Sequence, residues 1–411
     1  MGYVAVRGGG KAIEESLKLL EYERVSTSSA WGTDEIEGTF PDLVDQVMGE
    51  ASLYAPRLAA LALKQAQGSP DEAVFLLRAF RSTLERPYVS RSVDTGAMRV
   101  SRRVSAAFKD VPGGQLLGAT RDYSHRLLAF DLETEGPEEL AEKRAELTRH
   151  FDEAATAQAD DAGGSPSGSS RPAVLPRVLD YLRAEGLVNR VPDDDAEPVD
   201  ATMVPLTFPS SRSVRLQTLA RGMTQAVEAL GYAAIRGFGP AHPTVGELRQ
   251  GRVAVAVDHP LEPGGADNAY YLGSIPVTEV ESVFMSEGET AAPGDGLDAS
   301  DADAPGGLSL AIGYGLVLGR AETKAIAMSV LDRCLELGDK RYPTEDEEFV
   351  LYHVDGVEAT GFISHLKLPH YVTFQSKLSS VRGTRAADDR AADQAAAAAL
   401  EAKEASDAAA L

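Results

Sequence analysis

The chain has 411 residues, a formal net charge of −23 and a hydrophobic content of 43%, values that suit a globular protein of two or three domains. The strong acidity argues against nucleic acid as a partner, because duplex binding needs a cationic surface. No apolar run is long enough to span a bilayer and the N-terminus lacks the pattern of a signal peptide, so we expect a cytoplasmic protein that does not contact membranes.

The first part of the chain is predicted to be mostly helical. A short strand at 3–6 leads through a glycine turn into a helix at 11–20, and apolar residues recur at helical spacing from 41 to 84, with a break at 68–70. This pattern predicts a helical hairpin or small bundle. A third helix is expected over 98–108, followed by a helical arm that ends near Phe151.

The second part mixes helices and strands. After a flexible linker at 152–172, a helix through Leu187, strands at 252–257 and 275–280, an extended segment at 308–318 and a helix at 321–337 are predicted. An acidic insertion at 287–307 interrupts this part, and the Ala-rich acidic tail at 381–411 is expected to be a frayed helix or disordered. The prediction is an α+β fold: an α-rich N-terminal domain (1–151), a mixed central sheet and a second α/β module (173–380).

His365 and His370 form the most informative motif. They stand five residues apart with Pro369 between them, so they cannot share a helical face and should form a bent pair on a loop. Neutral imidazoles suit zinc, whose other ligands would come from elsewhere. Those ligands are either a second polypeptide or the side chains of His353, Asp346, Glu347, Glu348 and Glu358. Alternatively, each histidine only makes a hydrogen bond at the surface or in the core.

Two loops carry charged side chains next to glycine turns. Lys109 and Asp110 precede the turn at 112–114, and Asp122 and Arg126 follow it, which is typical of a ligand-binding loop but equally of a simple turn and a helix cap. In the same way, Arg236 and Glu247 flank a glycine-bearing loop near His242.

Two further motifs have a structural alternative. Arg212 and Arg215 follow Ser211 at the start of a predicted helix, where they form either a phosphate clamp or a capped helix with solvent-facing arginines. Gly313, Gly315 and Gly319 do not have the spacing of a dinucleotide-binding fingerprint, and they allow tight packing instead. The single cysteine, Cys334, excludes a disulfide within the chain and is expected to be buried.

Taken together, these segments resemble the I subunit of the bacterial carbon-phosphorus lyase core complex, the PhnI family. The resemblance covers nearly the whole chain except the linker at 152–172, the acidic insertion at 287–307 and the tail. It is carried by the motifs at 3–6, 61–66, 75–79, 110–118, 122–128, 211–213, 236–239, 313–317, 346–351 and 364–371.

The resemblance implies an enzyme of phosphonate catabolism. With its G, H and L companions it would replace the adenine of ATP by an alkylphosphonate at ribose C1, giving α-D-ribose 1-methylphosphonate 5-triphosphate. Alone, it would be a purine nucleosidase that acts on ATP or GTP. The resemblance also implies a complex with G, H and J subunits and with ATP-binding-cassette-type K and L subunits, in which two copies of this chain pair. His365 and His370 match zinc ligands at the interface with the J subunit.

The chemistry of the implied reaction sets requirements for the site. Breaking an N-glycosidic bond builds positive charge on the sugar, so a carboxylate near the ring and cations for the phosphates are needed. The carboxylate candidates are Asp110, Asp122 and Glu247, and the candidate anion binders are Lys109, Arg126, Arg212, Arg215 and Arg236. The alternative to an enzyme is a non-catalytic scaffold that completes a metal site of a partner subunit.

Overall fold

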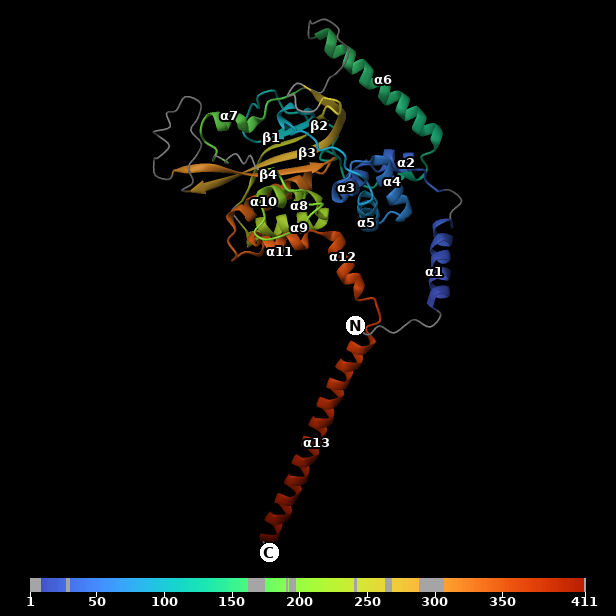
Figure 1. Cartoon of the computed structure of the whole chain (residues 1–411), viewed down its shortest axis with the longest axis vertical. Helices are drawn as coiled ribbons and strands as arrows, with labels where there is room; N and C mark the ends of the chain where they lie inside the picture. The colour runs from blue at the N-terminus through green and yellow to red at the C-terminus, as the bar shows by residue number, and fades with distance from the viewer. Residues whose placement is uncertain are drawn as a thin grey trace. The chain divides into compact units, whose positions relative to one another are not determined.

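The structure is a computed structural model that describes residues 9–26, 30–161, 174–189, 191, 197–239, 242–262, 268–287 and 307–409 (Figure 1). The chain divides into two compact units, Gly32–Gly356 and Met1–Trp31 together with Val357–Leu411. The predicted strand at 3–6, most of the linker and most of the acidic insertion lie outside the described residues. The fold class is α+β, as predicted.

The larger unit contains α2 (Thr33–Thr39), α3 (Pro41–Ala51), α4 (Pro56–Gln65), α5 (Pro70–Arg81), α6 (Pro137–Asp161), α7 (Val178–Ala184), α8 (Arg212–Arg221), α9 (Thr224–Ala233), α10 (Glu322–Leu337) and α11 (Glu347–His353). The smaller unit contains α1 (Gly9–Arg24), α12 (Gly356–His365) and α13 (Tyr371–Ala409). The tail is therefore helical as far as Ala409. Among the described residues, no helix combines the length and apolar character needed to cross a membrane.

The predicted bundle at 41–84 is confirmed as α3, α4 and α5. Each of these helices begins with a proline at its first position, where the missing N–H costs no helical hydrogen bond. The predicted break at 68–70 lies between α4 and α5, where Ser69 caps α5 by accepting a hydrogen bond from the Glu72 amide.

The sheet has four strands in the order β1 (Arg99–Ser105), β2 (Thr244–Asp258), β3 (Ala269–Glu287) and β4 (Leu308–Leu318). The predicted strands at 252–257 and 275–280 and the extended segment at 308–318 are confirmed. The prediction of a mixed sheet is wrong, because all three strand pairs are antiparallel. From β2 to β4 each strand pairs with the next one along the chain in this way, whereas β1 reaches β2 across the segment that contains α6, α7, α8 and α9.

The prediction of a helix over 98–108 is also wrong, because β1 occupies most of that segment and pairs with β2. This pairing joins the part of the chain before the predicted linker to the part after it. The expected domain boundary at 152–172 therefore lies inside the unit Gly32–Gly356.

Helix α10 packs on one face of the sheet (Figure 1), where Val280, Val317 and Met328 share a buried cluster. The contact is close because of two glycines in β4. A Cβ on Gly313 would lie 2.0 Å from the Ser329 carbonyl oxygen, and one on Gly315 would lie 2.1 Å from the Ala325 carbonyl oxygen. The glycine motif at 313–319 therefore serves helix–sheet packing, as its structural interpretation predicted.

The opposite face of the sheet carries buried ion pairs. Glu279 binds Arg249 and accepts a hydrogen bond from Tyr314 Oη at 2.8 Å, and Glu247 binds Arg103. Burial and the neighbouring Glu279 carboxylate raise the pKa of Tyr314 well above its ordinary value, so the phenol stays protonated as a donor.

Candidate functional site

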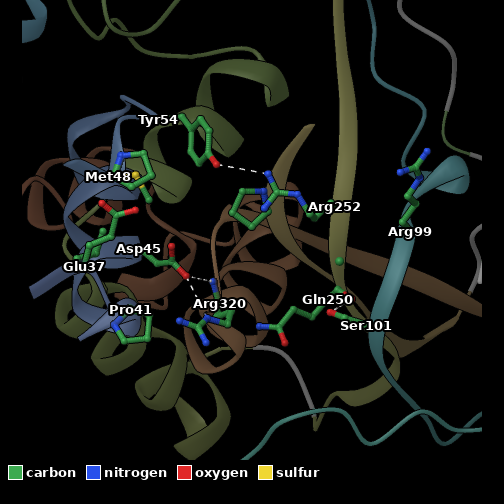
Figure 2. A pocket seen from close by; sticks show the side chains of 14 residues that line it. Glu37, Pro41, Asp45, Met48, Tyr54, Arg99, Ser101, Gln250, Arg252 and Arg320 are labelled. Atoms are coloured by element: carbon green, nitrogen blue, oxygen red, sulfur yellow. Dashed lines mark hydrogen bonds and ion pairs between the residues drawn. The ribbon is translucent and has the colours of Figure 1, made fainter. Parts of the chain in front are cut away.

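Two adjoining hollows lie in the larger unit, where the N-terminal helices meet the sheet. We call the first the arginine hollow; its volume is about 440 Å³ and it is lined by Pro41, Asp42, Ala119, Thr120, Arg121, Asp122, Arg126, Gln250, Arg320 and Glu322. The second, the tyrosine hollow, has a volume of about 400 Å³ and is lined by Glu37, Pro41, Val44, Asp45, Met48, Tyr54, Pro56, Arg99, Ser101, Gln250, Gly251, Arg252, Pro276 and Arg320 (Figure 2). Both volumes are typical of small-molecule sites.

The arginine hollow brings together Asp122 and Arg126, two of the residues singled out in the sequence. Asp122 accepts a hydrogen bond from Arg102 Nη2 at 2.6 Å. Arg126 adopts a left-handed backbone conformation with φ of 57° and donates from Nε to the Arg121 carbonyl oxygen at 3.1 Å. A bulky residue in this conformation is strained, and the strain is maintained here at the edge of a hollow.

Arg102 on β1 holds two of the three carboxylates of the arginine hollow in place, Asp122 and Glu322. Its side chain is 5% exposed, and Nε donates to Glu322 Oε1 at 2.6 Å while Nη1 donates to the Leu117 carbonyl oxygen. Burial opposes its charge, but the hydrogen bond and charge of Glu322, together with Asp122, outweigh burial and raise the pKa of Arg102. The guanidinium therefore stays charged and fixes Asp122 and Glu322 beside each other.

Arg320 forms part of the wall between the two hollows. Its Nε lies 3.3 Å from Asp45 Oδ2 and its Nη2 lies 3.2 Å from Asp42 Oδ1. Its backbone amide also donates to Asp45 Oδ2 at 3.0 Å, so the aspartate sets the position of the whole residue. Figure 2 shows the Asp45–Arg320 contact on the side of the tyrosine hollow.

The tyrosine hollow is more apolar. Val44, Met48 and prolines line it, and Tyr54 lies beside Arg252 on its wall (Figure 2). The Arg252 guanidinium is held by Ser274, to whose Oγ its Nε donates at 2.9 Å, and its Nη2 lies 3.4 Å from Tyr54 Oη. One flat ring and one flat cation are thus fixed at the rim of the hollow.

Glu247 lies elsewhere, in the interior of the sheet. It is 2% exposed, accepts from Arg103 Nε at 2.8 Å, and accepts from the Val178 amide at 2.8 Å. Burial raises the pKa of its carboxyl against the opposing effects of the Val178 amide and of two arginines. It lines neither hollow.

The remaining predicted residues do not line the hollows either. Ser211 caps α8, as the structural alternative predicted, but Arg212 does not face solvent: its Nη2 lies 2.6 Å from Oδ2 of the buried Asp332. Arg215 donates to the Ser210 carbonyl oxygen, and Arg236 lies over the Tyr232 ring at 5.9 Å. Lys109 and Asp110 are exposed on the loop after β1.

His365 and His370 belong to the smaller unit and lie close together. His365 ends α12 and His370 precedes α13, with ring centroids 4.9 Å apart and an interplanar angle of 71°. His370 Nε2 lies 3.2 Å from the His365 carbonyl oxygen. The bend at Pro369 thus produces the expected pair. Within the described ranges, no group of three or more His, Cys, Asp or Glu side chains is arranged to hold a metal ion.

Sequence reasoning missed Arg102, Glu322 and Arg320, because each acts through residues distant in the chain. One signal was available: Arg320 and Glu322 follow Gly319 directly at the end of a strand, where loops present side chains to ligands. Arg102 gave no such signal, since its segment was interpreted as a helix.

Comparison with known proteins agrees with the resemblance seen in the sequence. Residues 2–388 match the family described as bacterial phosphonate metabolism protein (PhnI). The chain is 42% identical over 386 residues to the α-D-ribose 1-methylphosphonate 5-triphosphate synthase subunit PhnI of Escherichia coli, with 92% of this chain and 97% of that protein covered. The protein of the same name from Rhizobium meliloti is 41% identical, with 95% and 96% covered.

A further relative, the putative C-P lyase subunit protein HtxH of Stutzerimonas stutzeri, is 43% identical over 94% of this chain and 96% of that protein. These three relatives match 92–95% of this chain and almost their own full length, so the similarity is not confined to one domain. The chain belongs to the PhnI family of bacterial phosphonate metabolism proteins.

Proposed function

We propose that this protein is a subunit of the carbon-phosphorus lyase pathway that displaces adenine from ATP with an alkylphosphonate, giving α-D-ribose 1-methylphosphonate 5-triphosphate. Without companions it uses water as acceptor and acts as a purine nucleosidase on ATP or GTP. The names of its relatives support the reaction. The observation that carries the proposal here is the arginine hollow, where Arg121, Arg126 and Arg320 stand beside two oriented carboxylates.

The carboxylates and the arginines of the arginine hollow have different parts in the reaction. The C1–N bond to the purine breaks, a C1–O bond to the phosphonate forms, and the purine leaves with the bonding electron pair and takes up a proton. Positive charge that develops on the sugar is stabilised by Asp122 and Glu322, which Arg102 holds in place. Arg121 and Arg126 bind the phosphate oxygens. The proposal assigns no step to Glu247, Asp110, Lys109, Arg212, Arg215 or Arg236.

The test is adenine release from ATP by the assembled complex. Asp122→Asn should lower the rate by about 10²-fold or more, the loss typical when a group that stabilises transition-state charge is removed. Arg126→Ala should mainly raise the ATP concentration needed for half-maximal rate. The matched control is Arg341→Ala, since the Arg341 side chain is 83% exposed and lines neither hollow. Full activity of Asp122→Asn would contradict the assignment.

For the metal, we propose that His365 and His370 hold zinc together with ligands from the J subunit. The pair suits the ion, because two imidazoles whose ring centroids lie 4.9 Å apart can supply two of its ligands. Zinc bound there would act as a Lewis acid. His365→Ala with His370→Ala should remove one zinc per copy from the assembled complex, measured by metal analysis, whereas His150→Ala should not. Undiminished zinc would exclude these ligands.

One observation favours the alternative, a scaffold that completes a partner's site. Phe362, Ile363 and Leu366 beside the histidines are 77%, 64% and 68% exposed, a cluster of apolar side chains that suits burial by another chain. The proposal includes the G, H, J, K and L subunits as partners and a second copy of this chain. A scaffold predicts no adenine release with any combination of companions, and zinc that depends on the histidines.

A further inference from the structure

We propose that the tyrosine hollow binds the purine base of the nucleotide whose phosphates occupy the arginine hollow, with the ribose crossing between them at Arg320 and Gln250. This inference rests on the proposed function and assigns a separate part of the substrate to each hollow. Its basis is that the two hollows share Pro41, Gln250 and Arg320 as a common wall. A ligand with two chemically different ends can therefore reach into both.

The two hollows differ in the chemistry they offer. Val44, Met48, Pro56 and Pro276 give the tyrosine hollow an apolar lining, whereas the arginine hollow is lined mainly by charged and polar groups. A purine is flat and largely apolar on its faces, and a triphosphate is a polyanion. The apolar lining therefore suits the base, and the arginines suit the phosphates.

Tyr54 and Arg252 supply the surfaces that a base would stack on. The Tyr54 side chain is 41% exposed, so its ring is accessible, and the Arg252 guanidinium lies next to it, with Nη2 3.4 Å from Tyr54 Oη (Figure 2). Ser274 fixes that guanidinium through its Oγ and its carbonyl oxygen. Any base can stack on an aromatic ring or on an arginine plane, which agrees with a site for both adenine and guanine.

The carboxylates of the tyrosine hollow supply acceptors for the edge of a purine. Glu37 and Asp45 line it together with Arg99, Arg252 and Arg320. The same carboxylates accept hydrogen bonds from N–H groups, which a purine has at its edge and a phosphate does not. The apolar lining and these acceptors therefore assign the base to Tyr54 and leave the phosphates to the arginine hollow.

The experiment measures four affinities of the full chain by calorimetry, for adenosine, inorganic tripolyphosphate, ATP and methylphosphonate. Tyr54→Ala should weaken adenosine and ATP by roughly 5- to 150-fold, the contribution of one base–aromatic stack, and leave tripolyphosphate unchanged. Tyr54→Phe, which keeps the ring, should retain most of the adenosine affinity. Arg126→Ala should show the reverse pattern, with weaker tripolyphosphate and unchanged adenosine. Unchanged tripolyphosphate affinity also shows that Tyr54→Ala is folded.

The inference fails if Tyr54→Ala binds adenosine as the unaltered chain does, or if it weakens methylphosphonate instead, which would assign the hollow to the acceptor. Failure of the proposed function is a different result. In that case the assembled complex with the unaltered chain releases no adenine from ATP. A complex that releases adenine while Tyr54→Ala keeps its adenosine affinity overturns only the assignment of the base.

Discussion

Substitution of Glu247 by Gln tests the buried ion pair of the sheet. Glu247 and Arg103 are 2% and 0% exposed, and their Nε–Oε1 distance is 2.8 Å. Gln has nearly the shape of Glu but no charge, so the variant leaves a buried guanidinium without its counter-charge. The two terminal nitrogens of Arg103 have no hydrogen-bond partner in the described structure, so the guanidinium depends on the contact of its Nε with Glu247. We expect the free energy of unfolding to fall by about 3–5 kcal/mol, the usual cost of breaking a buried pair.

Chemical denaturation followed by circular dichroism measures this loss. The control is the double substitution Arg103→Met with Glu247→Leu, which removes both charges and should recover most of the stability, because apolar residues of similar volume replace buried ion pairs well. Adenine release per folded molecule should be unchanged in Glu247→Gln, since Glu247 lines neither hollow. A variant with full stability and no adenine release would refute this reasoning and identify the carboxylate as catalytic.

Three further predictions concern packing, pH and a second ion pair. Gly315→Ala should destabilise the protein by about 1–3 kcal/mol in thermal or chemical unfolding, because its Cβ meets a helix carbonyl oxygen, whereas Gly38→Ala, whose Cβ would meet nothing within 4 Å, should not. Burial lowers the pKa of Lys324 from 10.5 to about 8, so the unfolded chain binds more protons between those values and stability should rise with pH across that range. The gain, about 3 kcal/mol, should be absent in Lys324→Met, and equal slopes would contradict it. Arg212→Met should lose about 1–3 kcal/mol of stability, because Asp332 is left unpaired. The affinity for ATP should not change. Weaker ATP binding at full stability would instead support the interpretation of Arg212 as part of a phosphate clamp.

The elements whose pattern has a single interpretation were predicted correctly. The apolar spacing at 41–84, with a proline at the start of each helix, can be satisfied only by helices, and alternation at 252–257 only by a strand. The segment of β1 is different. Its Val100, Val104 and Phe108 are four residues apart, a spacing that suits one face of a helix and also one face of a strand.

A β-bulge hid the strand further. The register of β1 against β2 shifts between Val100 and Arg102, so residues before and after it do not keep one alternating pattern. Two arginines that the pattern places in solvent, Arg102 and Arg103, are in fact buried by pairing with acids from other strands and helices. Such pairs join distant parts of the chain, and a local pattern contains no information about them.

The candidate site could be predicted only where its residues lie close together in the chain. Asp122 and Arg126 lie on one loop, so their proximity follows from the sequence. Their partners Arg102, Arg320 and Glu322 come from β1 and from the start of α10, and only the tertiary fold brings them together. The cap at Ser211 and the packing role of the glycines of β4 were predicted for a related reason, because both depend on short segments of chain. The solvent-facing position predicted for Arg212 is wrong, because its partner Asp332 lies far along the chain.

The outer margin of β1 is occupied by this chain's own backbone and side chains. Arg103 exchanges two backbone hydrogen bonds with Leu116, and Gln115 makes a matching pair with Ser105 through its amide. An edge strand with unpaired amides is a template that any extended peptide can add to. Under the proposed function this protein assembles with several subunits, and this cover then prevents a foreign strand from pairing with the sheet at these positions. The correct partner subunit is then selected by contacts between side chains and not by backbone hydrogen bonds.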